Sequence, residues 1–262
     1  MTRFQPGISS AASEGRLYVL KGTALCVVRE GAGVRVPVGP AGEGAIHLGS
    51  LAGVACFARS LGEGEALPTS TEAVSVRQLF GALPDEDFAI AGLALGLTAW
   101  DRDHRFCGRC GAPTEPSKTE RVRACTRCAF HAYPRLSPAI IALVERDGRA
   151  LLARNARVNM PFFTTLAGFV EVGETLEHAV AREIREEAGI EIRDVKYFGS
   201  QPWPFSNSLM IGFTAHWASG EIKADESEIL EPAWFAPDKL PMVAPKLSIA
   251  RQLIDDFVKR HA

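Results

Sequence analysis

The sequence predicts a protein of mixed α and β structure, of α+β or α/β class, in three consecutive parts. Residues 1–98 alternate short apolar runs with glycine-rich turns, and residues 99–133 are basic and rich in cysteine. Residues 134–262 combine strand patterns with two amphipathic helices. With 262 residues, of which 47% are hydrophobic, the chain can bury a sizeable core in its larger parts. We therefore expect three domains with these bounds.

The first part predicts a small strand-rich domain followed by a helix. Pro84 and the three acids that follow it are typical of a helix start. Apolar residues from Phe88 to Trp100 then recur at helical spacing, which predicts a helix over about 86–102. Short apolar runs bounded by glycine turns predict strands at 17–20, 24–28 and 54–58.

The third part predicts strands and two further helices. Asp147-Gly148 separates two apolar runs, at 139–144 and 150–153, and indicates a β-hairpin because a type I′ turn needs two positive φ angles. A helix is expected over 176–188, with Gly189 as its left-handed C-cap. The remaining expected elements are strands at 195–199 and 209–218 and an amphipathic helix at about 246–260, with Leu247, Ala250, Leu253, Ile254 and Phe257 on one side.

The composition excludes several classes of protein. The 29 basic and 31 acidic residues give a net charge of −2, so only local patches favour nucleic acid or an anionic membrane. The longest apolar segment, Phe88–Trp100, is shorter than the roughly 20 residues that span a bilayer. The first residues hold no continuous apolar run of the kind found in a secretory signal. We expect a cytoplasmic protein with no membrane contact.

Four of the six cysteines form two CxxC pairs, which indicates a metal site. Each pair brings two sulfurs onto one turn, and fourteen residues separate the pairs, as in a closed tetrahedral S4 site. Thiolate ligands favour a structural Zn²⁺ over iron, and free or redox-active cysteines are the alternative. Cys26 and Cys56 lie in apolar strand contexts and are expected to be small buried residues. The predicted ligands are Cys107, Cys110, Cys125 and Cys128.

The cysteine-rich segment is also basic. Its arginines and lysine have two interpretations: they contact nucleic-acid phosphates, or they are solvated charges on a small domain that a bound metal holds together. For binding of a duplex we favour the solvated interpretation. The cations are Arg105, Arg109, Lys118, Arg121, Arg123 and Arg127.

A group of acids on the first helix of the third part is the strongest functional pattern in the chain. Glu183, Glu186 and Glu187 are spaced i, i+3 and i+4, so their carboxylates share one helical face. Neighbouring acids repel one another, and hard cations such as Mg²⁺ or Mn²⁺ relieve that repulsion while sharing phosphate oxygens with a substrate. Glu174 can fold back from the preceding loop, and Arg182 can pair with it or with Glu186. A solvated acidic helix face is the alternative.

Residues 168–190 follow the pattern G-x5-E-x7-R-E-U-x-E-E-x-G-U, in which U is a bulky aliphatic residue. This segment resembles the Nudix box at every defined position. The resemblance implies an α/β/α sandwich with a mixed sheet, and hydrolysis of a nucleoside diphosphate linked to another moiety by metal-activated water. It further implies Mg²⁺ or Mn²⁺ ligands at Glu183, Glu186, Glu187 and the carbonyl of Ala167. The implied catalytic set is Glu174, Arg182, Glu183, Glu186 and Glu187.

Downstream of the box, the segment Ser200–Ser208 reads SQPWPFSNS. Two prolines stiffen an extended chain and would project Trp203 and Phe205 for stacking on a flat ring, or these aromatics pack into the core. The segment resembles the SQPWPFPxS element of the NADH pyrophosphatase subfamily, from which it departs at Ser206. The resemblance implies substrate contacts at Gln201, Pro202, Trp203, Pro204, Phe205, Ser206, Asn207 and Ser208.

The whole layout also resembles that subfamily: a Nudix-like domain, a zinc ribbon opening with FCGRCG, and HAYPRLSP leading into the catalytic domain. The resemblance implies a homodimer and a further metal ligand at Glu228, for which a solvated acid is the alternative. Tyr133 is implied as a substrate contact, and packing is its alternative. The other implied substrate contacts are Arg77, Glu120, Phe169 and Ala250.

These patterns together predict a diphosphatase that cuts NADH or NAD⁺ into AMP and nicotinamide mononucleotide. The same site would accept NAD at the 5′ end of an RNA, because the adenosine could carry a chain. A Nudix hydrolase for another dinucleotide or a nucleotide sugar, such as ADP-ribose, is the nearest alternative. A zinc-ribbon nucleic-acid module with an inactive Nudix domain is the alternative of another class.

Overall fold

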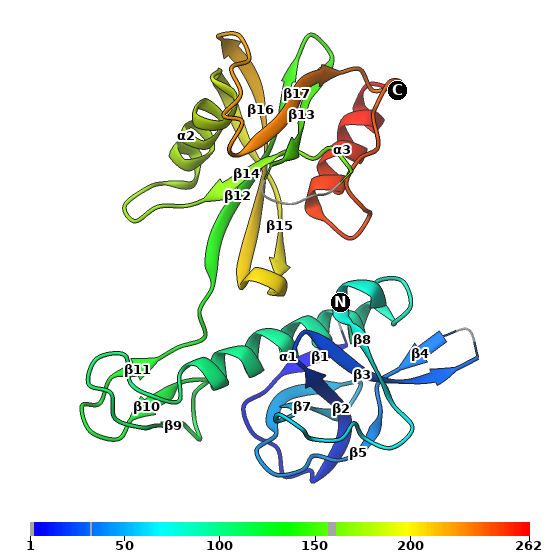
Figure 1. The fold of residues 1–262 in the computed structure, drawn as a ribbon, viewed down its shortest axis with the longest axis vertical. Helices are drawn as coiled ribbons and strands as arrows, with labels where there is room; N and C mark the ends of the chain where they lie inside the picture. The colour runs from blue at the N-terminus through cyan, green and yellow to red at the C-terminus, as the bar shows by residue number, and fades with distance from the viewer. Residues whose placement is uncertain (1–2, 32, 157–160) are drawn as a thin grey trace. The chain divides into compact units, whose positions relative to one another are not determined.

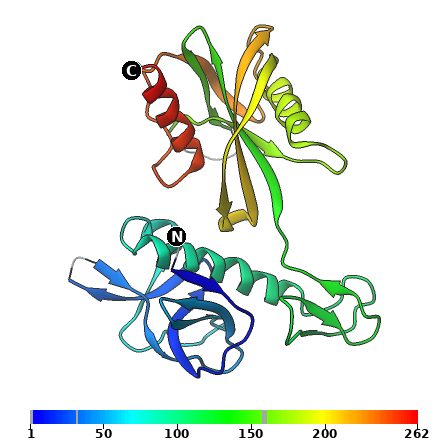
Figure 2. The same cartoon turned by 180° about the vertical axis from the view of Figure 1, so that it is seen from behind.

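The computed structural model describes residues 3–31, 33–156 and 161–262. Residues 1–2, 32 and 157–160, which belong to the first and third predicted domains, lie outside the described residues. The chain forms two compact units. The first is Met1–Arg135 with Pro204–Asn207, and the second is Leu136–Trp203 with Ser208–Ala262. Figures 1 and 2 show each unit from two opposite sides.

The first unit contains an eight-stranded sheet and the helix α1 (Asp85–Asp103). The sheet has the strand order β1-β6-β7-β2-β3-β4, with β5 paired to β2 and β8 to β3. Its β2 and β7 run parallel, and the other pairs are antiparallel. The strands are β1 (Phe4–Pro6), β2 (Glu14–Lys21), β3 (Ala24–Glu30), β4 (Gly33–Arg35), β5 (Val38–Pro40), β6 (Ile46–Leu51), β7 (Val54–Ser60) and β8 (Glu72–Ser75), and the short helix η1 (Val76–Leu79) follows.

The helix α1 packs its apolar side against this sheet, as the spacing predicts. Ile90, Leu97 and Trp100 are buried in the core with strand residues. The acids of its first turn do more than start the helix. Asp87 is buried and accepts hydrogen bonds from the Tyr18 hydroxyl at 2.7 Å and from the Arg16 guanidinium at 2.9 Å. This buried network ties the start of α1 to β2.

The cysteine-rich segment forms a small antiparallel sheet of β9 (Thr114–Pro116), β10 (Arg123–Cys125) and β11 (His131–Ala132), in the order β11-β10-β9. Two of its cations are internal, which corrects their interpretation as solvated charges. Arg121 donates to the carbonyls of Gly7 and His47, at 2.6 and 3.3 Å. Arg123 is 8% exposed and donates to both oxygens of Thr114. These two side chains therefore anchor the segment to its surroundings.

The second unit is a six-stranded mixed sheet between two helices, as predicted. The order is β15-β16-β12-β13-β17, with β14 paired to β12; β12 and β16 run parallel. The helix α2 (Leu176–Ala188) shares one core with this sheet and α3 (Ile249–Arg260) shares another, so each covers a different face (Figures 1 and 2). The strands are β12 (Ser137–Arg146), β13 (Arg149–Asn155), β14 (Leu166–Phe169), β15 (Glu191–Trp203), β16 (Ser208–Ser219) and β17 (Ile229–Phe235).

Residues that adopt positive φ angles mark the turn and the helix end that the sequence predicts correctly. Asp147 and Gly148 have φ of 50° and 69°, which confirms the β-hairpin, and Gly189 caps α2 at φ 72°. The predicted start of the last helix at 246 is wrong. Ser248 is the N-cap and accepts a hydrogen bond from the backbone of Arg251, so Leu247 lies outside the helix.

The segment around the two prolines is also different from the predicted extended chain. Pro202 lies in β15 opposite Leu209, but Pro204 begins a turn of 3₁₀ helix, η2 (Pro204–Ser206). The turn closes a hairpin, because Trp203 pairs with Ser208. No helix within the described residues is long and apolar enough to cross a membrane.

Candidate active site

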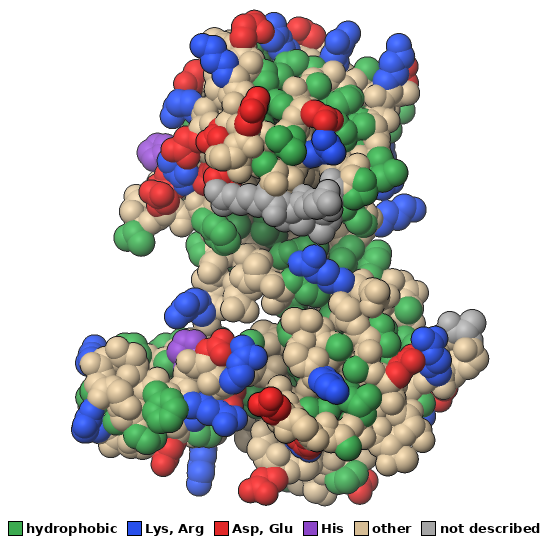
Figure 3. Space-filling view, viewed as in Figure 1, with side chains coloured by type: hydrophobic (Ala, Val, Ile, Leu, Met, Phe, Trp, Pro, Cys, Tyr) green, Lys and Arg blue, Asp and Glu red, His purple; other side chains and the backbone are tan. Residues whose placement is uncertain are grey.

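The acidic face of α2 packs over β14, the strand that contains Gly168. Glu183 is directly over this glycine: a Cβ at position 168 would lie 1.9 Å from Cδ of Glu183. Ala167 precedes it in β14 and is half-buried. Burial raises the pKa of Glu183, and the Arg182 hydrogen bond opposes that effect. Figure 3 shows acidic side chains gathered over α2.

Arg182 connects the predicted catalytic carboxylates. Its Nε and Nη2 donate to the two oxygens of Glu174 at 2.7 and 2.9 Å, a bidentate pair. Its Nη1 donates to Glu183 at 2.8 Å and to Glu186 at 2.9 Å. Its Nη2 also donates to the carbonyl of Phe169 at 2.9 Å. The guanidinium lowers the pKa of Glu174 to about 2, so that carboxylate stays ionised. The geometry confirms both of the predicted pairings.

The other acids differ in burial. Glu187 is 7% exposed, whereas the side chain of Glu186 is 59% exposed. The charge of Glu228 also acts on Glu183 and favours its protonated form. Glu228 stands in a turn that packs on the end of α2, where the backbone N–H of Asp225 donates to the carbonyl of Glu187 at 3.0 Å. The structure therefore brings Glu183 and Glu228 close together, although 45 positions separate them in the sequence.

Asp225 is a residue whose contribution the sequence analysis missed. Its carboxylate accepts from the backbone N–H of Ser227 at 2.9 Å and from the Ser227 hydroxyl at 2.6 Å. Its carbonyl accepts from Glu228 and Ile229. An Asp followed two positions later by Ser is a recognised turn pattern, so the signal was present.

This arrangement fits a divalent cation. The donors are carboxylates and one carbonyl, Ala167, and such hard oxygen ligands suit Mg²⁺ or Mn²⁺. The close approach of Glu183 to Gly168 leaves no room for a side chain where the carboxylate lies. The acids are not gathered as tightly as the cysteines. Within the described residues, only the four cysteines form a group of three or more candidate ligands with all their atoms inside 4.8 Å.

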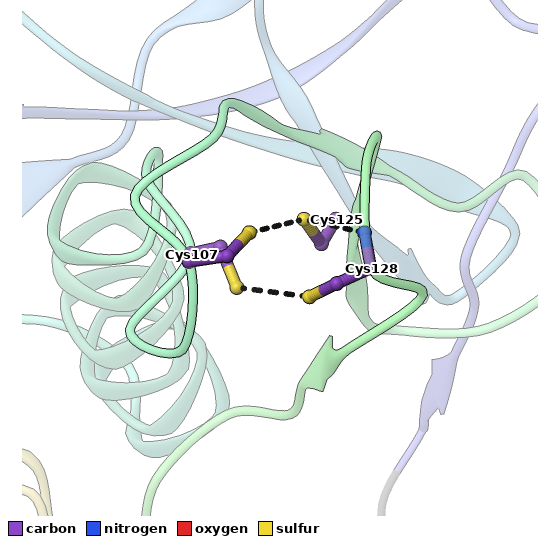
Figure 4. A group of neighbouring side chains, drawn as sticks. Cys107, Cys125 and Cys128 are labelled. Carbon is purple, nitrogen blue, oxygen red and sulfur yellow. Dashed lines mark hydrogen bonds between the residues drawn. The ribbon is translucent and has the colours of Figure 1, made fainter.

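The cysteines form a metal centre of the predicted type. Figure 4 shows Cys107 on one loop facing Cys125 and Cys128 on the other. The Sγ–Sγ distances are 3.7 Å for Cys107–Cys128 and 3.5 Å for Cys110–Cys125. A hydrogen bond from the Ala112 backbone lowers the pKa of Cys110 to about 6, which favours the thiolate that binds metal. The four sulfurs lie within 4.8 Å of one another and fit a closed, four-coordinate zinc site. Such a site has no open coordination position for a catalytic water.

The two other cysteines, Cys26 and Cys56, are fully buried, as expected.

The residues of the SQPWPFSNS segment do not share one environment. Gln201 uses its amide to hold the start of α3: its Nε2 donates to the carbonyl of Leu247 and its Oε1 accepts from the N–H of Ile249, both at 2.7 Å. Pro202, Ser206 and Asn207 are exposed, Trp203 and Pro204 are half-buried, and Ser208 is 3% exposed.

Phe205 is half-buried against the core of the first unit, and the guanidinium of Arg77 lies 4.5 Å from its ring centroid. Its ring is therefore engaged by protein, as the core-packing alternative expected.

The remaining predicted contacts are spread over both units. In the first unit, the Tyr133 hydroxyl donates to Glu120 at 3.3 Å, and the Tyr133 ring is 56% exposed. In the second unit, Phe169 is also 56% exposed at the end of β14. Ala250 is 4% exposed in the core under α3, so its methyl group packs there.

Comparison with known families matches three consecutive segments of the chain. Residues 134–257 match the NUDIX domain, and residues 102–133 match the NADH pyrophosphatase zinc ribbon domain. Residues 11–100 match the NADH pyrophosphatase-like rudimentary NUDIX domain. The crystal structure of a NUDIX hydrolase from Nitrosomonas europaea is similar in fold, with a TM-score of 0.52 and 23% identity. That likeness covers 60% of this chain and 92% of the other.

The fold and the acidic site thus define a Nudix hydrolase with a zinc ribbon. Two curated relatives are more similar in sequence, and both are named NAD-capped RNA hydrolase NudC. The protein of Deinococcus radiodurans is 47% identical over 220 residues, which cover 82% of this chain and 78% of the relative. That of Salmonella heidelberg is 48% identical over 187 residues, 70% of this chain and 71% of the relative. The chain belongs to the NudC family of Nudix hydrolases.

Proposed function

We propose that this chain hydrolyses the diphosphate of NADH or NAD⁺ to AMP and the reduced or oxidised nicotinamide mononucleotide, and removes the NAD cap from the 5′ end of RNA by cutting the same bond. The observation that carries the proposal is the likeness to NAD-capped RNA hydrolases over 220 residues. The acid set of α2 supports it, because Glu183, Glu186 and Glu187 are all present on one face.

The chemistry follows from the residues around Gly168. Glu183, Glu187 and Glu228, with the carbonyl of Ala167, would hold Mg²⁺ or Mn²⁺, and Glu186 would assist. A bound cation neutralises charge on the diphosphate and lowers the pKa of the attacking water. Arg182 keeps Glu183 oriented through its hydrogen bond, and Glu174 in turn fixes Arg182.

The rest of the chain would bind the two halves of the substrate. Phe169 offers an exposed ring beside the acids and would stack on a base. Trp203 and Phe205 are the two half-buried aromatics of the segment 201–208, and Trp203 would also contact the substrate. Tyr133 and Glu120 would supply polar contacts. We also propose that the domains are residues 1–98, 99–133 and 134–262. We propose that the protein is cytoplasmic and forms a homodimer. Sedimentation as a monomer at micromolar concentration would contradict the homodimer.

Product analysis tests the function directly. The pure protein is incubated with NADH, ADP-ribose, a diadenosine polyphosphate and NAD-capped RNA, in Mg²⁺ and separately in Mn²⁺. We expect AMP and the reduced nicotinamide mononucleotide from NADH, and a 5′-monophosphate RNA with release of nicotinamide mononucleotide from the capped substrate. Comparable turnover of all the small substrates would refute selectivity for NAD(H) and favour a broader dinucleotide or nucleotide-sugar hydrolase.

A matched pair of variants separates an enzyme from an inactive Nudix domain. Glu187→Gln removes the charge of a buried acid, and we expect kcat/KM for NADH to fall by at least about 100-fold. Glu177→Gln, an exposed acid on the same helix, is the control and should leave activity unchanged. Equal activity of both variants, with the fold retained by circular dichroism, would contradict the proposed role of the acids.

A further inference from the structure

A cavity of about 380 Å³ lies at the tip of the β12–β13 hairpin, away from the acid cluster. It is lined by Arg146, Asp147, Arg149 and Trp234. No part of the proposed catalytic machinery uses these residues. The cavity belongs wholly to the second unit, so its position relative to α2 is defined by one sheet.

Aromatic stacking holds one wall of this cavity in place. The guanidinium carbon of Arg146 lies 4.0 Å from the ring centroid of Trp217 and 6.0 Å from that of Trp234. The Trp217 ring is fixed because its Nε1 donates to the carbonyl of Gly220 at 2.9 Å. Ion pairs contribute less, since the nearest carboxylate, Asp147, is 3.7 Å from Arg146 and is 90% exposed. The Arg146 guanidinium is therefore held against the Trp217 ring and lines the cavity together with the Trp234 indole.

The second cation of the cavity is available for a ligand. Arg149 is exposed and forms no ion pair with any residue in the described part of the chain. A guanidinium in this state binds phosphate oxygens through two parallel hydrogen bonds. The exposed carboxylate of Asp147 adds an acceptor for a ribose hydroxyl or an amino group. An aromatic wall, a free guanidinium and an acceptor are together the partners of a nucleotide.

The position of the cavity suits a nucleotide that is joined to the substrate. Along β17, Trp234 pairs with Leu151 and Ile229 pairs with Asn155, so the cavity lies four residue steps along β13 from the Glu228 end of the strand. Four residues of strand span about 13 Å. Trp217 and Trp234 pack in the same core as α2, which places them on the face of the sheet that carries the acids.

We propose that this cavity binds a nucleotide of a single-stranded RNA whose 5′ end carries the NAD cap. The inference rests on the proposed function and adds a site for the RNA chain. A base would stack on the indole–guanidinium wall, and Arg149 would bind the adjoining phosphate. Free NADH has no chain to reach the cavity, so this site would distinguish capped RNA from the dinucleotide.

The test measures RNA binding without turnover. A fluorescein-labelled, uncapped single-stranded oligoribonucleotide is titrated with the full-length protein and followed by fluorescence anisotropy at several salt concentrations. We expect Arg149→Glu to raise Kd about tenfold and to reduce the salt slope by about one. Lys196→Glu, an exposed cation on β15 at the other edge of the sheet, carries the same charge change and should keep the wild-type Kd.

Kinetics complete the test and separate the two proposals. Arg149→Glu should raise KM for NAD-capped RNA while kcat/KM for NADH stays at the wild-type value. Wild-type RNA binding by Arg149→Glu, or equal losses on both substrates, would overturn the RNA site. If RNA binding depends on Arg149 but the wild-type protein does not hydrolyse NADH, the proposed function falls and the binding site stands. Arg149→Gln should give a smaller loss in the same direction.

Discussion

Gly168 lies so close beneath Glu183 that a Cβ at position 168 would come within 1.9 Å of Cδ and within 2.2 Å of both carboxylate oxygens of that residue. The contact joins β14 to α2, two elements that the loop 170–175 separates. Its consequence is geometric: the carboxylate occupies space that only glycine leaves open.

Gly168→Ala should therefore displace the Glu183 carboxylate and lower kcat/KM for NADH by about 100-fold, since a misplacement of about 1 Å can have that effect. Gly199→Ala is the matched control, because nothing lies within 4 Å of a Cβ built there. Steady-state kinetics on both variants make the measurement. Unchanged activity in Gly168→Ala would show that the position of Glu183 is not critical.

Arg182 and Glu174 should act as one unit. Lysine cannot form the bidentate pair, so Arg182→Lys is expected to lower kcat/KM by about 10- to 100-fold. Glu174→Gln should give a similar loss, and the double variant should be little worse than either single one. A double-mutant cycle on kcat/KM measures the coupling. Additive losses would mean that the two residues act separately.

Gln201 is expected to act by positioning the start of α3. Gln201→Leu removes both hydrogen bonds to the loop, which should increase hydrogen exchange at 247–250 and raise KM for NADH more than it lowers kcat. Gln252→Leu, at an exposed position of α3, should change neither quantity. A kinetic defect in Gln201→Leu without faster exchange would instead indicate a direct substrate contact.

His47 should make the first unit less stable in mild acid. Burial lowers the pKa of His47 below its usual value, and the charge of Arg121 adds to this effect. The unfolded chain therefore binds the proton first, and stability that is present above about pH 6.5 is lost as pH falls from there towards the lower pKa of the folded state. Thermal unfolding between about pH 7.5 and 5.5 should show this slope, and His47→Phe should reduce it.

His216→Gln, at an exposed position, is the control for that experiment and should keep the full slope. A slope that persists in His47→Phe would assign the acid sensitivity to other groups.

Zinc removal should make the ribbon less stable without directly abolishing NADH hydrolysis. Metal analysis of the reduced protein should find one zinc per chain, bound by the sulfurs that lie within 4.8 Å of one another. After chelation and return of Mg²⁺, proteolysis of residues 102–133 should be faster, while NADH turnover persists. Cys128→Ser should reproduce the faster proteolysis and Cys26→Ala should not, because Cys26 is outside the cluster. A reduced protein without zinc would end this assignment.

Particular residues show which structural features the sequence predicts and which it does not. Periodicity and caps predicted α2 to its last residue, because Gly189 adopts the left-handed conformation that ends it. The start of α3 was predicted three residues early, since apolar spacing continues through Leu247 whereas the cap is at Ser248. The ribbon cations looked equivalent in sequence, but Arg121 and Arg123 are internal anchors. Spacing does not report which of several like charges is buried.

The sequence by itself determined the chemistry of this protein: four thiols in two knuckles, three acids at helical spacing, and an arginine that can bridge them. These features are local, because each CxxC knuckle and the acidic helix face depend on residues within one or two turns of backbone. Only the tertiary structure decided that Glu228 approaches Glu183, that Gln201 holds α3, and that Arg146 stacks on Trp217. Those relationships join segments that are far apart in the chain, and sheet pairing and packing set them, since no short-range pattern encodes a distance across the core.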